Sequence, residues 1–160
     1  MTSAYGFAYV ERALREGIGR RAFRAKEIAL VAAFFGEPLR CVYCDSPEVG
    51  RWDHLVPVVS GGETVVGNMV PACAPCDDSK SKRHFATWLR LQAQRGAMSP
   101  ESAEERITRL REYMERFEYQ PEEYGSRLSA DRAVQLADLR SRLSTLRRDV
   151  EEFIAQVRKT

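Results

Sequence analysis

The sequence between residues 41 and 82 decides the fold: it reads CVYC (41–44), WDHLVP (52–57), SGG (60–62) and GNMVPACAPCDDSKSK (67–82). This stretch contains two Cys-x-x-Cys pairs, and they hold every cysteine of the chain. Four thiolates in two such pairs suit a tetrahedral Zn²⁺ and leave the ion no open position. We therefore predict one structural zinc, with the chemistry supplied by neighbouring residues. The predicted zinc ligands are Cys41, Cys44, Cys73 and Cys76.

Two other interpretations of the cysteines stay open at this stage, redox-active pairs and a disulfide framework. Zinc is favoured because paired thiols with no leftover cysteine are typical of metal sites in a reducing compartment. The chain has no apolar run long enough for a membrane span and no leading segment like a signal peptide. We therefore expect a cytoplasmic protein without a membrane partner.

The charge balance gives little indication of the partner. The formal net charge is +2, and four thiolates with one Zn²⁺ would bring it close to neutral. Affinity for nucleic acid must then come from local basic patches. We expect two such patches, although each also fits a solvated helix face. The first patch includes Arg20, Arg21 and Arg24, and the second comprises Lys80, Lys82 and Arg83.

Several motifs follow one another in a specific order: Asp53-His54, Gly61-Gly62, Asn68 and Cys73-x-x-Cys76-Asp77-x-x-Lys80. In this order they resemble the zinc-knuckle branch of the HNH nucleases, whose core is a ββα-metal (His-Me finger) motif. The resemblance covers about a quarter of the chain. It departs at Asp77, where many family members carry His or Asn.

The resemblance implies a metal-dependent endonuclease that hydrolyses DNA phosphodiester bonds and leaves 5′-phosphates. It implies that His54 is the general base and that Asp53 and Asp77 are ligands of one catalytic metal ion. It implies that Asn68 ties down the loop that holds His54. Carboxylate ligands favour Mg²⁺ or Mn²⁺ as the catalytic ion.

Each of these assignments has an alternative. His54 also fits a structural histidine, and Asp77 also fits a helix N-cap. Asp78 is the second candidate for the metal ligand. Lys80 lies one turn after Asp77, so a helix would place both on one face, and we expect Lys80 to contact phosphate.

The apolar pattern predicts a mostly helical α+β protein. We expect N-terminal helices over 1–40, the nuclease core over 41–97, and a C-terminal helical hairpin or coiled coil over 98–160. Within these segments, the pattern and the turn residues predict helices at 8–17, 21–35, 84–95 and 101–118, strands at 51–58 and 65–70, and a helix from residue 76 or 77. Ser99 and Ser129 are predicted N-caps.

The last predicted helix, after Ser129, has apolar residues at heptad spacing. They are Leu136, Leu139, Leu143, Leu146, Val150, Phe153 and Val157. A parallel homodimer would bring Arg142 against Arg147 of the other copy, so we expect an antiparallel hairpin with the helix at 101–118. A homodimer through the C-terminal helices stays open. Two rival functions also stay open: a catalytically silent zinc-knuckle module that binds nucleic acid or protein, and an oligomerisation adaptor.

Overall fold

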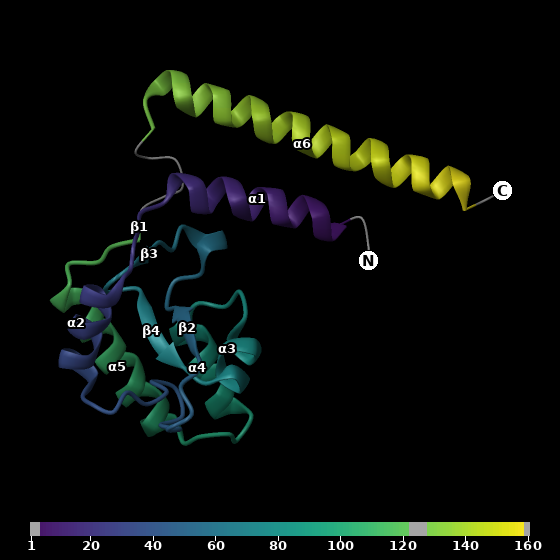
Figure 1. The fold of residues 1–160 in the computed structure, drawn as a ribbon. Helices are drawn as coiled ribbons and strands as arrows, with labels where there is room; N and C mark the ends of the chain where they lie inside the picture. Colours follow the sequence, from purple (N-terminus) through teal and green to yellow (C-terminus); the bar gives the residue numbers. More distant parts are fainter. Residues whose placement is uncertain (1–3, 122–127, 159–160) are drawn as a thin grey trace. The chain divides into compact units, whose positions relative to one another are not determined.

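A computed structural model describes residues 4–121 and 128–158, and the contacts divide them into two compact units (Figure 1). One unit joins residues 4–18 with 128–158, and the other spans 19–121. The first unit contains α1 (Ala4–Ile18) and α6 (Ala130–Val157). The second contains β1 (Arg21–Ala22), α2 (Ala25–Phe35), β2 (Arg51–His54), a 3-10 turn (Val58–Ser60), β3 (Thr64–Val65), β4 (Met69–Ala72), α3 (Ala74–Lys80), α4 (Phe85–Gln94) and α5 (Pro100–Arg116).

Two short sheets organise the second unit. Strand β2 pairs antiparallel with β4, so that Asp53 lies opposite Val70 and His54 opposite Met69. Strand β1 pairs parallel with β3, with Arg21 opposite Thr64. Helix α3 follows β4 directly, and α4 packs against α5. The predicted class, a mostly helical α+β protein, is confirmed.

The core of this unit is formed by apolar side chains from α2, the first Cys-x-x-Cys segment, the strands, α4 and α5. Tyr43 and Trp88 pack edge to face with ring centroids 5.1 Å apart. Such pairs add to the hydrophobic gain of burying two large rings. Fully or nearly fully buried residues of this core include Val31, Leu55, Val70, Phe85, Leu89, Ile107, Leu110 and Tyr113. Cys41 and Cys73 are buried in this core, so the core fixes one cysteine of each Cys-x-x-Cys pair.

Helices α5 and α6 begin at the N-caps that the sequence predicted. The Ser99 hydroxyl accepts a hydrogen bond from the Ser102 amide at 3.1 Å, and Pro100 is the first residue of α5. The Ser129 hydroxyl accepts from the Arg132 amide at 3.4 Å. A side-chain acceptor satisfies one of the amides that a helix start leaves unpaired. Both predicted caps are confirmed.

The strands differ from the prediction. Strand β2 ends at His54 instead of Val58, because the chain then turns and Leu55 donates to the Asn68 carbonyl at 2.9 Å. The predicted strand at 65–70 is two strands, β3 and β4, separated by Gly67 with φ of 89°. That left-handed conformation breaks a strand and favours glycine.

The long C-terminal helix also differs from the expectation. We expected α5 and α6 to form a hairpin, but each has another partner within its own unit: α5 packs on α4, and α6 packs on α1. Heptad spacing specifies an apolar face and not the helix that covers it. Within the described ranges, no helix combines the length and apolar character that a membrane span needs.

Candidate functional site

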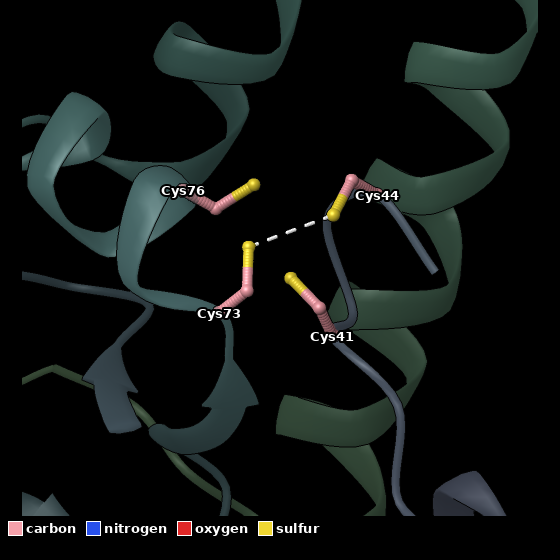
Figure 2. Close-up of side chains that lie close together, drawn as sticks. All are labelled: Cys41, Cys44, Cys73 and Cys76. Atoms are coloured by element: carbon pink, nitrogen blue, oxygen red, sulfur yellow. Dashed lines mark hydrogen bonds between the residues drawn. The ribbon is translucent and has the colours of Figure 1, made fainter. Parts of the chain in front are cut away.

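The four cysteines converge on one point, as Figure 2 shows. Cys41 and Cys44 lie on the turn that follows α2, whereas Cys73 is the N-cap of α3 and Cys76 lies in its first turn. The Asp45 amide donates to the Cys41 carbonyl at 2.8 Å, and the Asp77 amide donates to the Cys73 carbonyl at 3.1 Å. These bonds fold each Cys-x-x-Cys segment so that its two thiols face the same side.

The sulfur positions fit a tetrahedral zinc. All four Sγ atoms lie within 4.8 Å of one another, and the Cys44 and Cys73 sulfurs are 3.7 Å apart. Zn–S bonds of ~2.3 Å give tetrahedral S···S edges of about 3.8 Å. A disulfide needs sulfurs about 2.05 Å apart, and all four cysteines are free in this structure. The donor set therefore fits a zinc ion better than a disulfide pair.

Three of the four thiols have a shifted pKa. A hydrogen bond from Cys76 lowers the pKa of Cys41 to about 4. Hydrogen bonding with Cys41 raises the pKa of Cys76, and burial raises that of Cys44. A metal ion that binds here must displace the protons that the thiols carry.

Asp53 lies buried beside the knuckle and is held by two other residues. Its side chain is 6% exposed, and the Tyr43 hydroxyl donates to its Oδ2 at 2.7 Å. The Lys80 ammonium donates to Asp53 Oδ1 at 3.1 Å and to the His54 carbonyl at 2.7 Å, and it lies 3.0 Å from Asp53 Oδ2. Lys80 is fully buried.

Burial shapes the titration of this trio. Desolvation raises the pKa of Asp53 and lowers that of Lys80, while their mutual attraction opposes both shifts. Burial also raises the pKa of Tyr43, so its hydroxyl stays protonated and donates. We expected Lys80 to reach phosphate at the surface. The structure instead directs its ammonium inward, because a buried carboxylate needs a partner charge.

His54 ends strand β2 and is half-buried. Its Nε2 lies 3.0 Å from the Thr64 hydroxyl on β3. Its carbonyl accepts from Lys80, so both the backbone and the ring of this residue are positioned. Asp53 and His54 are neighbours in a strand, so their side chains start from opposite faces, which leaves only Asp53 deeply buried.

Asn68 holds the loop that follows His54. It is fully buried, and its Oδ1 accepts from the Val56 amide at 2.8 Å. Its Nδ2 donates to the Val56 carbonyl at 3.2 Å and to the Glu63 carbonyl at 2.8 Å. Gly62 completes the loop, since a Cβ there would lie 1.7 Å from the Val56 carbonyl oxygen.

Asp77 and Asp78 share one basic partner. Arg51 Nη1 lies 3.1 Å from an Asp77 carboxylate oxygen and also contacts the Asp78 carboxylate. The Asp77 side chain is 27% exposed, whereas that of Asp78 is 67% exposed. Asp77 therefore faces the protein more than Asp78 does, and both are close to strand β2 through Arg51.

The predicted catalytic ligands are not gathered as tightly as the cysteines. Within the described parts of the chain, the four cysteines are the one group of three or more His, Cys, Asp or Glu positioned to hold a metal ion. Asp53 and Asp77 supply oxygens of the type that Mg²⁺ and Mn²⁺ prefer. In this structure, however, Asp53 is paired with Lys80 and Asp77 with Arg51.

The first basic patch includes residues of strand β1, which pairs with β3 close to His54. Arg21 pairs through its backbone with Thr64, whose hydroxyl contacts His54. Arg20 is less available to bind phosphate, because its guanidinium already pairs with the buried Glu63 carboxylate at 2.8 Å. Arg24 is exposed at the start of α2, and Lys82 and Arg83 are exposed just after α3.

Sequence reasoning missed three residues of this site, Tyr43, Arg51 and Thr64, and it missed the inward direction of Lys80. Tyr43 had one usable signal, because it lies inside the first Cys-x-x-Cys pair and is therefore fixed beside the metal. Arg51 is two residues before Asp53 in the same strand, which places both on one face. The Thr64 contact depends on the β1–β3 pairing and has no local signal.

Comparison with known proteins agrees with this geometry. Residues 41–83 match the family model described as HNH endonuclease. No curated protein and no solved structure matches the chain significantly. The matched segment begins at Cys41, contains β2, β3, β4 and α3, and ends just before α4. Residues 41–83 are therefore similar to the HNH endonuclease family.

Proposed function

We propose that this chain is a metal-dependent endonuclease that hydrolyses DNA phosphodiester bonds. The observation that carries the proposal is the coincidence of the HNH match with one cluster of polar residues. Within 41–83, His54 lies between the buried Asp53 and a loop that Asn68 holds by three hydrogen bonds. The strand pair β2–β4 followed by α3 is consistent with a ββα-metal core.

His54 is the proposed general base. A neutral imidazole has one donor and one acceptor nitrogen. The Thr64 hydroxyl beside Nε2 helps to orient the ring, and the acceptor nitrogen would take the proton from the attacking water. Asn68 fixes the backbone two residues after His54, which limits the positions that the ring can adopt. Such positioning is part of the rate gain of a base.

Asp53 and Asp77 are the proposed ligands of a divalent ion, Mg²⁺ or Mn²⁺. When bound, this ion would neutralise phosphoryl charge and stabilise the leaving 3′-oxygen. Asp77 needs to release only the exposed Arg51, whereas Asp53 shares its two oxygens with Tyr43 and Lys80. Asp77 is thus the more accessible of the two carboxylates.

The proposed DNA contacts flank this site on both sides. Arg21 lies beside Thr64, and Lys82 and Arg83 follow α3. Such residues neutralise phosphates and position the duplex without reading its sequence. Because Arg20 is paired with Glu63, we assign it the role of fixing β1 instead.

A plasmid-nicking assay with Mg²⁺ or Mn²⁺, compared with EDTA, tests the proposal. His54→Ala should lower the rate by on the order of a hundredfold or more, because it removes the base. The matched control is His84→Asn, which replaces the other histidine of the chain. His84 Nδ1 accepts from the Ala86 amide at the start of α4, and asparagine retains an N-cap acceptor. Equal rates for wild type and His54→Ala would remove His54 from the mechanism.

A second candidate function is a silent zinc-knuckle module that binds nucleic acid without cutting it. The pairing of Asp53 with Lys80 and of Asp77 with Arg51 favours this alternative, because both carboxylates already have cationic partners. The two candidates differ in one experiment. The silent module binds DNA in a mobility-shift assay but yields no nicked product with any divalent metal.

A further inference from the structure

The two-helix unit has little buried apolar surface of its own. In its described part, Leu136 is the one buried apolar side chain, and it is 9% exposed. Helix α6 contacts α1, its Leu143 and Val150 are half-buried, and the Arg140 Nε lies 3.4 Å from a Glu11 carboxylate oxygen. Helices in proteins gain most of their stability from tertiary packing, so two helices with one buried apolar side chain form a poorly stabilised unit.

A second apolar stripe on α6 is not covered by α1. Leu139, Leu146 and Phe153 are 46%, 54% and 66% exposed. They are one heptad apart, so they form a straight row with a spacing of about 10.5 Å along the helix. Large apolar side chains exposed in a continuous row mark an interaction surface.

This stripe is complementary to itself in one orientation. When two α6 helices run antiparallel with Leu146 on the twofold axis, Leu146 meets its own copy. Leu139 then lies opposite the partner subunit's Phe153, and the reverse pair forms on the other side of the axis. Residues 135–157 of both copies overlap, a length of about 34 Å. An isologous interface needs this kind of self-complementarity.

On one side of the stripe the charges favour the same register, whereas on the other side Arg147 comes close to the partner subunit's Arg147. Arg142 lies one turn before Leu146, and Asp149 lies one turn after it on the same side. In the antiparallel pair, Arg142 faces the partner subunit's Asp149, and symmetry repeats this pair. Their side chains are 74% and 60% exposed. A parallel pair would instead place Arg142 against the partner subunit's Arg147.

We propose that a second copy of this chain covers the Leu139–Leu146–Phe153 stripe through an antiparallel α6–α6 contact. The two copies of α1 then flank this contact, so four helices share one apolar core. The proposal concerns residues 128–158 and does not depend on nuclease activity.

Sedimentation analysis of the full chain tests the dimer. The wild-type mass should be twice 18.2 kDa at micromolar concentration. Leu146→Glu should yield 18.2 kDa, because it places two carboxylates on the axis and removes the central contact. The control is Val134→Glu, since Val134 is 70% exposed and lies on the opposite face of α6. Circular dichroism checks that both variants stay helical.

A charge swap tests the orientation. Arg142→Asp should weaken the dimer on the order of tenfold, because it creates two Asp–Asp contacts in place of two Arg–Asp pairs. Adding Asp149→Arg should restore the wild-type affinity. In a parallel dimer, Arg142→Asp would face Arg147 and strengthen association. A wild-type monomer at all concentrations, or stronger association of Arg142→Asp, overturns the proposal.

Discussion

Removal of the Lys80 ammonium should destabilise the unit at 19–121 severely. In Lys80→Met, an apolar side chain of similar length replaces the cation and fills its space. Asp53 would then remain buried with only the Tyr43 hydroxyl as a hydrogen-bond donor from the former trio. The His54 carbonyl would lose its partner at the same time.

The expected loss follows from this geometry. Lys80 is fully buried and Asp53 is 6% exposed, so neither charge is screened by solvent. Breaking a buried pair by removing one partner costs about 3–5 kcal/mol. A domain has a total free energy of unfolding of about 5–15 kcal/mol. The variant should therefore be close to unfolding at room temperature.

Tryptophan fluorescence during urea unfolding of the zinc-loaded protein measures this loss. Both tryptophans, Trp52 and Trp88, lie in the 19–121 unit, so the signal reports that unit alone. Lys82→Met is the matched control, because Lys82 is an exposed lysine two residues away. It should change the free energy of unfolding by less than ~0.5 kcal/mol.

The double variant Asp53→Asn/Lys80→Met separates charge from packing. It removes both charges and retains an acceptor for Tyr43, so it should lie within about 2 kcal/mol of the wild type. The reasoning is refuted if Lys80→Met behaves like Lys82→Met. It is equally refuted if the double variant is as unstable as the sum of its two single changes, since the two sites would then be independent.

Three further predictions follow from the same unit. Metal analysis should find one zinc per chain, and Cys73→Ser should unfold the knuckle, because metal binding and folding are coupled in such sites; a fully folded metal-free protein would contradict this. Gly62→Ala should cost about 3 kcal/mol or more in urea unfolding, since its Cβ would lie 1.7 Å from the Val56 carbonyl oxygen; a change below 1 kcal/mol would mean that the loop shifts freely. Asp77→Ala should lose nicking with Mg²⁺ and Mn²⁺, Asp77→His should shift the preference toward softer metals, and Asp78→Ala should matter little; the reverse order in the same nicking assay would assign the ligand to Asp78.

The sequence predicted the features that depend on local spacing. The two Cys-x-x-Cys pairs and the Ser99 cap need only a few neighbouring residues, so the pattern contains the necessary information. The order of motifs was sufficient to predict the HNH family, which the match over 41–83 confirms. The roles of His54 and Asn68 stay predictions, although the loop geometry is compatible with them.

Features that depend on tertiary contacts were not predictable in this way. Helical spacing placed Lys80 on the face of Asp77 but gave no information on burial, which depends on Asp53, a residue far away in the sequence. The heptads of α6 predicted an apolar face, but the covering helix, α1, comes from the opposite end of the chain. Only packing decides such pairings.

Tyr43 connects two sites whose ligands are different. Its backbone lies between Cys41 and Cys44, and its hydroxyl holds Asp53. Zinc that bound the four cysteines and ordered this segment would therefore also order the Asp53 carboxylate. Coupling between two binding events is reciprocal. If bound zinc changes the affinity of the Asp53 site for an ion or substrate by some factor, that ion or substrate changes the affinity of the cysteines for zinc by the same factor. Zinc bound at the four cysteines would then act on the neighbouring site as well as on the fold, and its exchange rate would report what occupies that site.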